Sequence, residues 1–341
     1  MQLKVLGMNV LVRPALKVLL ASPRGFCAGV ERAIQIVERA IAKYGAPVYV
    51  RHEIVHNGHV VESLARRGAV FVEAIEAIPR GAVTVFSAHG VSTAVVQAAR
   101  ARDLRIIDAT CPLVTKVHLQ AQRYARRGYA IVLVGHAGHE EVEGTRGSVD
   151  APVLVVGSVA DVAALPIPAE AAVAYVTQTT LSIDDTREII TALKARFPNI
   201  VGPELKDICY ATLNRQNAVR ALAAAVDLVL VVGARNSSNT NRLREVASQC
   251  GVPAYLIAGS AEIDPAWLAG VARVGVTAGA SAPEVLVAEV CARLRQLGAA
   301  AAEEMSGPRE TVMFRLPPLP GAAVPVPGPT RAPTAASVAV S

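Results

Sequence analysis

Short runs of Val, Ile and Leu alternate with longer amphipathic stretches, and this alternation restricts the possible folds of the chain more than any other feature. The runs that predict strands are Lys17–Leu20, Val48–Val50, Val83–Phe86, Arg105–Ile107, Ala130–Val134, Val153–Val156, Val173–Val176, Leu228–Val232, Ala254–Ile257 and Arg273–Val276. Helical spacing lies between them, as in Val30, Ile34, Val37 and Ile41, which share one helix face. Strands that alternate with helices over such a length predict an α/β fold with mostly parallel sheets.

The length of the chain and the spacing of its cysteines suggest how this fold is divided. At 341 residues, the chain exceeds the roughly 250–300 residues that one hydrophobic core supports. Cys27, Cys111 and Cys209 recur at similar intervals, each at the start of a strand–helix segment. We therefore expect three similar small αβ domains around a common centre, at 17–110, 111–208 and 209–305. Residues 1–16 are interpreted as an N-terminal extension, and the Pro- and Ala-rich residues 306–341 as a disordered tail.

Charge, hydropathy and cysteine usage exclude several classes of function. The net charge of +6 comes without a recognition motif or interleaved aromatic residues, so we expect no nucleic acid partner, and an acidic protein partner is favoured. No uncharged apolar run reaches about 18 residues, so we expect no membrane span. Five Cys without a secretory signal indicate the reducing cytoplasm, where clustered Cys more often serve metal or redox chemistry than disulfides.

Three of the five cysteines lie in turns between a predicted strand and a helix. Cys27 follows Gly-containing SPRGF, Cys111 precedes Pro112, and Cys209 opens the stretch YATLNRQ. Unpaired N–H groups and the positive end of a helix dipole favour a thiolate at such positions. Free Cys are also small buried hydrophobic residues, and Cys250 and Cys291 fit that description. Three thiolates suit either zinc or an iron–sulfur cluster with one iron left open, and their wide separation favours the cluster over a zinc ribbon.

Further polar residues follow the predicted strands, where open α/β sheets bind ligands. His56 and His89 each lie in a Gly-containing turn, and Glu141 follows His139 closely enough to be a proton donor with a pKa raised by burial. Hydroxyls and amides at helix starts are suited to phosphate, although helix capping alone explains any one of them. They are Thr179, Ser237, Ser238, Asn239 and Ser281. The chain has no Walker A motif and no GxGxxG after a strand.

Nine segments in order together resemble one family. They are SPRGFCAGVERAI, HEIVHNGHVVE, FSAHGVS, DATCPLVTKVH, GHAGHEEVEGT, TQTTLSIDDT, DICYATLNRQ, VVGARNSSNTNRL and VTAGASAPE. They are similar to the LytB-type 4-hydroxy-3-methylbut-2-enyl diphosphate reductases, the last enzymes of the non-mevalonate isoprenoid pathway. The resemblance runs from about Lys17 to Gly298, and implies reductive dehydroxylation of the substrate to isopentenyl and dimethylallyl diphosphates.

The resemblance also implies roles for individual residues. It implies three αβ domains around one 4Fe–4S cluster that has one open iron site and the ligands Cys27, Cys111 and Cys209. It places His56, His89, Ser237, Ser238, Asn239 and Ser281 on the substrate diphosphate. His139 and Thr179 would bind the substrate nearer the cluster, with Glu141 as proton donor. The family commonly has Pro before this glutamate, whereas this chain has Glu140, a second carboxylate that could perturb the pKa of the donor.

The electron source and two other classes of function complete the expectations. Because the chain has no flavin or nicotinamide motif, we expect an acidic ferredoxin or flavodoxin as electron donor, with the exposed-looking Arg123, Arg126 and Arg127 as candidate docking residues. One alternative is a cluster-bearing sensor or RNA-binding protein, which would need an exposed basic stripe. Another is a zinc-dependent hydrolase, which would be colourless where a cluster protein is brown.

Overall fold

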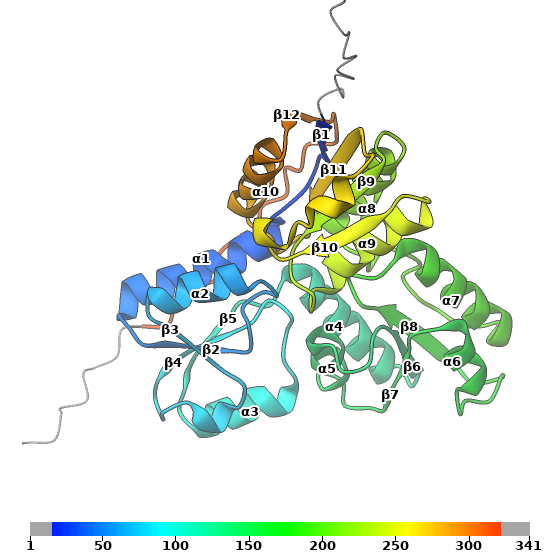
Figure 1. Ribbon diagram of the computed structural model, residues 1–341. Coiled ribbons are helices and arrows are strands. Elements are labelled where there is room, and N and C mark those ends of the chain that lie inside the picture. Colours follow the sequence, from blue (N-terminus) through cyan, green and yellow to red (C-terminus); the bar gives the residue numbers. More distant parts are fainter. Residues whose placement is uncertain (1–15, 322–341) are drawn as a thin grey trace, which may run out of the picture.

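Three parallel sheets with their helices surround a common centre in the computed structural model, which describes residues 16–321 (Figure 1). This arrangement confirms the predicted α/β class and its three-part architecture. All ten predicted strands are present, and the structure adds β3 (Ala69–Val72) and β12 (Ala299–Glu304). Among the described residues, no helix is both long and apolar enough to cross a membrane.

The first sheet has the order β3-β2-β4-β5. Its other strands are β2 (Val48–Arg51), β4 (Val83–Phe86) and β5 (Arg105–Asp108). Val48, Val50 and Val85 are fully or almost fully buried against Ile36 and Val37 of the first helix. The helices of this group are α1 (Ala28–Tyr44), α2 (Gly58–Arg66) and α3 (Thr93–Ala101), with a 3₁₀ turn at Ile75–Ala77.

The second sheet has the order β7-β6-β8. Its strands are β6 (Ala130–Val134), β7 (Val153–Val156) and β8 (Val173–Thr177). Both faces of β6 and β8 are buried, because helices cover the sheet on both sides, as parallel sheets require. These helices are α4 (Pro112–Arg126), α5 (Glu140–Arg146), α6 (Val159–Ala164) and α7 (Ile183–Arg196).

The third sheet has five strands in the order β10-β9-β11-β1-β12. They are β1 (Leu16–Leu20), β9 (Leu228–Val232), β10 (Ala254–Ile257), β11 (Arg273–Ala278) and β12. Helices α8 (Tyr210–Ala223), α9 (Ser238–Gln249) and α10 (Glu284–Gln296) cover it, with 3₁₀ turns at Ser260–Glu262 and Pro265–Leu268.

Strand β1 differs from the predicted segment 17–110, because it pairs within the third sheet. It runs parallel to β11, with Lys17 opposite Arg273 and Leu20 opposite Val276, and its other edge binds β12. Val18 is buried in the core of that sheet. The described part of the chain therefore begins in the third group and crosses to the first along the loop that carries Cys27. A five-residue apolar run does not specify which of three similar parallel sheets it will join.

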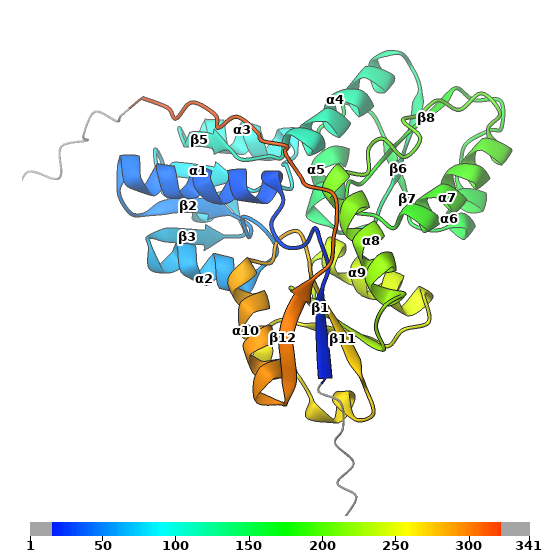
Figure 2. The same ribbon diagram turned by 90° about the horizontal axis from the view of Figure 1, so that it is seen from above.

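The segment 306–321 also differs from the expectation of a disordered tail. It lies across the molecule from β12 to the first group, as the orange-to-red trace in Figure 2 shows. Leu316 and Leu319 pack on the first core, and Lys43 Nζ donates to the carbonyl oxygens of Leu319 and Pro320 at 3.3 and 2.7 Å. These contacts hold a segment that has no helix or strand of its own. The rest of the predicted tail, and the predicted N-terminal extension except Leu16, lie outside the described residues.

Candidate functional site

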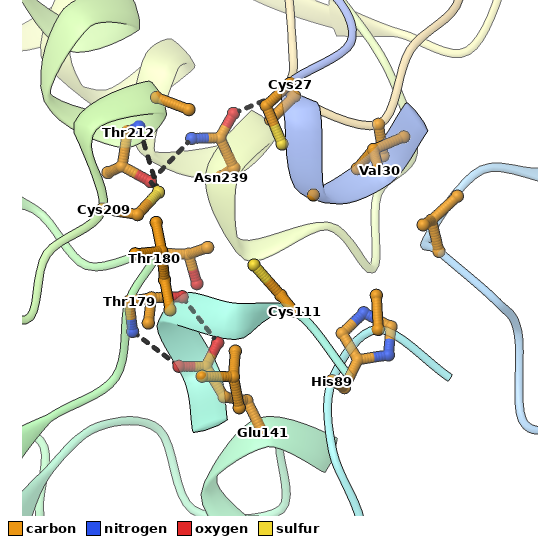
Figure 3. Close-up of a pocket in the computed structure, with 18 of the residues that line it drawn as sticks. Cys27, Val30, His89, Cys111, Glu141, Thr179, Thr180, Cys209, Thr212 and Asn239 are labelled. Atoms are coloured by element: carbon orange, nitrogen blue, oxygen red, sulfur yellow. Dashed lines mark hydrogen bonds between the residues drawn. The ribbon is translucent and has the colours of Figure 1, made fainter. Parts of the chain in front are cut away.

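Each of the three cysteines singled out from the sequence occupies the N-cap position of a helix. Cys27 precedes α1, Cys111 precedes α4 and Cys209 precedes α8. The three helices belong to the three different groups, and their N-terminal ends point into one cavity that all three cysteines line (Figure 3). The positive ends of three helix dipoles therefore converge on the place where three thiolates would carry negative charge.

All three sulfur atoms belong to residues of one cavity, and Gly29 leaves open the space between two of them. A Cβ atom on Gly29 would lie 2.8 Å from Cys111 Sγ and 3.8 Å from Cys27 Sγ, so the glycine leaves open the space between the two sulfurs. Within residues 16–321, however, the three thiols do not form a group whose ligand atoms all lie within 4.8 Å of one another. A centre larger than one ion fits this spacing.

Burial makes the thiols poor thiolates on their own. It is the main reason why the pKa of Cys111 is raised to about 12 and that of Cys209 to about 11, and the neighbouring cysteines act in the same direction. The Cys209 sulfur accepts hydrogen bonds from the Thr212 backbone N–H at 3.3 Å and contacts the Thr212 hydroxyl at 3.1 Å. A positively charged metal centre is what would stabilise three thiolates in this position.

Two arginines that the sequence analysis missed hold the cysteine loops in place. Arg215 is 0% exposed and donates to the carbonyl oxygens of Gly25 and Phe26, immediately before Cys27. Arg32 Nη1 donates to the carbonyl oxygens of Ala109 and Thr110, immediately before Cys111. Arg215 lies on α8 and Arg32 lies on α1, and each is far along the chain from the loop that it binds. Sequence spacing does not reveal such contacts.

Glu141 lies in the first turn of α5 with its carboxylate bound to Thr179. The Thr179 backbone N–H donates to Oε1 at 2.6 Å and its hydroxyl donates to Oε2 at 3.0 Å. The side chain is only 3% exposed. Burial raises the pKa of Glu141 to about 7, although both bonds from Thr179 act in the opposite direction. Near neutral pH this carboxyl group is therefore able both to hold and to release a proton.

Three histidines form a cluster on the same cavity. The His56 and His89 rings stack with centroids 4.2 Å apart, and His139 meets them edge-on at 5.5 and 6.0 Å. Burial lowers the pKa of His139 to about 4 and lowers that of His89 as well. The His139 Nδ1 atom accepts the backbone N–H of Glu141 at 3.1 Å, so its Nε2 carries the hydrogen. Neutral His139 is thus a hydrogen-bond donor through Nε2.

His56 differs from its two neighbours because it has carboxylates at both ring nitrogens. Nδ1 lies 3.1 Å from Glu53 and Nε2 lies 3.3 Å from Glu140. Burial opposes protonation of this ring, but the two carboxylates outweigh it and raise the pKa of His56. Glu53 is itself held by the Asn236 side-chain amide at 3.0 Å. His56 is therefore the one member of the three whose surroundings favour the protonated ring.

The remaining predicted residues reach the cavity from the third group. Ser237 caps α9 by accepting the Thr240 N–H, and Ser238 and Asn239 follow in the first turn of this 12-residue helix. The Ser281 hydroxyl donates to the His56 carbonyl at 2.9 Å, and Asn239 Oδ1 accepts the Ala280 N–H. All twelve predicted site residues line one cavity, together with Tyr210 and Phe314, which were not predicted.

The arginines proposed for partner docking lie away from this cavity. Arg123, Arg126 and Arg127 are exposed at the C-terminal end of α4, whose N-terminal end is capped by Cys111. A 15-residue helix is about 22 Å long, so almost its whole length separates these arginines from the thiols. Closer to the thiols, the partly exposed Lys116 lies one turn into the same helix and pairs with Asp207.

Both the sequence and the fold are similar to those of known proteins. The family model of the LytB protein matches residues 18–295. The 4-hydroxy-3-methylbut-2-enyl diphosphate reductase 2 of Bradyrhizobium diazoefficiens is 61% identical over 302 residues, which cover 89% of this chain and 98% of that protein. The corresponding reductase of Zymomonas mobilis is 57% identical, with 89% of each chain covered.

Two solved structures are similar to the whole described fold. The E-1-hydroxy-2-methyl-but-2-enyl-4-diphosphate reductase of Plasmodium falciparum has a TM-score of 0.84 at 38% identity and covers 89% of this chain and 96% of its own. The (E)-4-hydroxy-3-methyl-but-2-enyl diphosphate reductase described as the terminal enzyme of the non-mevalonate pathway has a TM-score of 0.58 at 32% identity, with 82% and 99% covered. With a matching family model over most of its length and relatives near 60% identity, this chain belongs to the LytB family.

Proposed function

We propose that this chain is an oxidoreductase of the non-mevalonate pathway that converts 4-hydroxy-3-methylbut-2-enyl diphosphate to isopentenyl and dimethylallyl diphosphates. The observation that carries this proposal is the single cavity that combines three thiols, a buried carboxyl group and a set of neutral hydrogen-bond donors. Reductive loss of an allylic hydroxyl needs an electron source, a proton for the leaving oxygen and a binding site for the diphosphate. The cavity has residues suited to each requirement.

For the electron source, we propose one 4Fe–4S cluster held by Cys27, Cys111 and Cys209, with one iron left without a protein ligand. Such a group, when bound, supplies electrons one at a time and a Lewis acid for the hydroxyl of the substrate. The open space beside Gly29 and the sulfur spacing support it. A single zinc ion binds sulfur at about 2.3 Å and would draw the three sulfurs within about 4 Å of one another, which does not fit this spacing.

For the diphosphate, we propose a site made mostly of neutral donors. No Lys or Arg lines the cavity among the described residues. His89, His139, Ser237, Ser238, Asn239 and Ser281 offer N–H and O–H groups, and the N-terminus of α9 adds the positive end of its dipole. His56 is the ring best suited to add a positive charge, because its two carboxylate neighbours favour the protonated form.

For the proton, we propose Glu141 as donor and Thr179 as its partner. With a pKa near 7, Glu141 is protonated in part at neutral pH, when most carboxyl groups are not. The Thr179 hydroxyl, 3.0 Å from Oε2, can pass this proton toward the substrate by accepting and donating at the same oxygen. Burial keeps bulk water from supplying the proton instead.

The electron donor is proposed to be a small acidic redox protein, a ferredoxin or flavodoxin. The net charge of +6 favours association with such a partner. Docking near Lys116, rather than near the distant arginines at the end of α4, would bring the donor closer to the thiols. The cytoplasmic location predicted from cysteine usage suits the five free thiols of the described chain.

Anaerobic purification followed by iron and sulfide analysis tests the proposal directly. We expect brown protein with about four irons and four sulfides per chain, and turnover of the allylic diphosphate by a reduced viologen dye. Colourless protein with one zinc per chain, or a cluster protein without turnover of this substrate, would contradict it.

A further inference from the structure

Glu140 contacts a residue of one cavity and lines another. Its carboxylate lies 3.3 Å from His56 Nε2, and His56 lines the cavity with the three thiols. Glu140 itself lines a separate side cavity of about 300 Å³, together with Arg51 and His52. Glu140 is half-buried and is the first residue of α5, so its side chain is able to rotate toward either cavity.

The contact between Glu140 and His56 is electrostatic and leaves the His56 Nε2 atom open to a better-aligned partner. His56 is 93% buried, since only 7% of it is exposed, yet its Nε2 has no well-aligned hydrogen-bond partner among the described residues. The 3.3 Å contact is therefore an ion pair whose geometry falls short of a hydrogen bond. A diphosphate oxygen placed on this nitrogen would make a charge-assisted hydrogen bond that Glu140 does not make.

The side cavity contains a group that lacks a partner and has the right charge for Glu140. Arg51 Nε is buried without a hydrogen-bond partner among the residues that the structure describes. Burial lowers the pKa of the Arg51 guanidinium, and Glu73, Glu140 and Glu76 act against that effect, which places the Glu140 carboxylate within electrostatic reach. Arg51 is half-buried, and a carboxylate that moved to it would supply a partner for the one buried N–H group that lacks one.

We propose that the Glu140 carboxylate takes the place of the diphosphate in the free protein. It pairs with His56 there, and it moves to Arg51 when a diphosphate oxygen binds His56. This inference rests on the proposed function, because it assumes that the cavity binds a diphosphate. It gives Glu140 a positioning role, since Glu140 touches His56 and not the reacting atoms. The free protein thereby keeps His56 paired without a bound ligand.

A cation between these residues is the competing explanation, and the hydrogen bonds argue against it. His56, His139 and Glu140 are the one group among the described residues whose ligand atoms lie within 4.8 Å of one another. However, His139 Nδ1 already accepts the Glu141 N–H, so Nε2 carries a hydrogen and does not offer a lone pair. A donor at His139 beside a charged His56 suits an anion.

The titratable groups around His56 determine whether its ring is protonated. Those that face it are Glu53, Glu140 and Glu141 as acids and His89 and His139 as bases. His89 and His139 stay neutral near pH 7, so the charge of His56 depends on Glu53 and Glu140. When diphosphate replaces Glu140, it brings negative charge to the same ring nitrogen, so the protonated form of His56 is favoured in both states.

Calorimetric titration of the anaerobically purified holoenzyme with inorganic diphosphate at pH 6 tests the exchange as a double-mutant cycle. The Glu140→Gln variant should bind diphosphate about fivefold more tightly than the unmodified protein, because the competing Glu140 carboxylate is gone. Arg51→Met should bind about fivefold more weakly, because Glu140 then has no second position. When Arg51→Met is added to Glu140→Gln, the affinity for diphosphate should stay almost the same as in the Glu140→Gln single variant.

The outcomes of this cycle separate the two proposals. Additive effects of the two substitutions would mean that Arg51 attracts diphosphate directly, and would overturn the exchange; so would unchanged affinity in Glu140→Gln. Glu143→Gln is the matched control, because Glu143 lines the same side cavity but pairs with Arg146. No binding of diphosphate by the unmodified protein would overturn the diphosphate site itself, and the exchange with it.

Discussion

Thr179 binds both carboxylate oxygens of Glu141, one through its backbone N–H and the other through its hydroxyl. Glu141 comes from the start of α5 and Thr179 from the loop after β8, so the carboxyl ends of two neighbouring strands of the second sheet bring them together. Two bonds of 2.6 and 3.0 Å fix the orientation of a carboxyl group whose pKa is near 7. Orientation and pKa together are what a general acid requires.

Glu141→Gln should leave the protein folded and brown but nearly inactive. The amide keeps the shape of the side chain and one acceptor for Thr179, while it loses the exchangeable proton. General acid catalysis contributes on the order of 10²–10⁴-fold, so we expect kcat to fall by about that factor with a much smaller change in KM. Single-turnover kinetics with prereduced protein measure this. Full activity would remove Glu141 from the mechanism.

The rate should fall as the pH rises above neutrality. The pKa of Glu141 is raised to about 7, so the group is protonated and able to donate below that pH and is deprotonated above it. We therefore expect kcat to be level below about pH 6 and to fall about tenfold per pH unit above about pH 8. A one-electron dye whose reduction takes up no proton isolates this dependence. A profile that stays flat to pH 9 would contradict the assignment.

The strands and the cysteine positions could be predicted from sequence because both depend on local pattern. Apolar runs of three to five residues and the Gly, Ser and Pro around each Cys are visible in short windows, and all ten strands and all three N-cap positions agree with the structure. Strand β12, with the sequence AAAAEE, has little β propensity and depends on pairing with β1.

What the sequence did not predict involves pairs of residues that are far apart along the chain. The contact between Glu140 and His56, the placement of β1 beside β11, and the loops held by Arg215 all join segments whose separation carries no periodic signal. The C-terminal segment shows the same limit. Its Pro- and Ala-rich composition is typical of disorder, yet Leu316, Leu319 and Glu310 find partners on helices encoded much earlier.

Gly29→Ala should prevent assembly of the metal centre without unfolding the chain. The added methyl group would lie 2.8 Å from Cys111 Sγ, in the space between two proposed ligands. Alanine in the first turn of α1 is otherwise favourable, by up to about 1 kcal/mol over glycine. We expect an unchanged circular dichroism spectrum and less than about half of the normal iron content. Gly58→Ala, at the start of α2 with no atom within 4 Å, is the control; equal iron in both variants would contradict the prediction.

Cys209→Ser should give folded protein with little iron. Serine is a better N-cap than cysteine, so α8 and its bond from the Thr212 N–H should persist while the proposed ligand is lost. Iron and sulfide analysis after anaerobic purification measures the loss. Cys250→Ser is the matched control, because Cys250 is exposed and at the C-terminal end of α9. Normal iron in the Cys209 variant would overturn its assignment as a ligand.

Glu310→Ala should loosen the cysteine loop from a distance. Glu310 pairs with fully buried Arg215 at 3.0 Å, and Arg215 in turn holds Gly25 and Phe26 just before Cys27. Removing one partner of a buried ion pair costs about 3–5 kcal/mol, because it leaves a buried charge without compensation. We therefore expect a lower melting temperature and faster loss of iron to a chelator. Glu303→Ala, which changes an exposed glutamate on β12, is the control. A variant that melts lower but releases iron at the normal rate would show that the segment stabilises the fold without supporting the metal site.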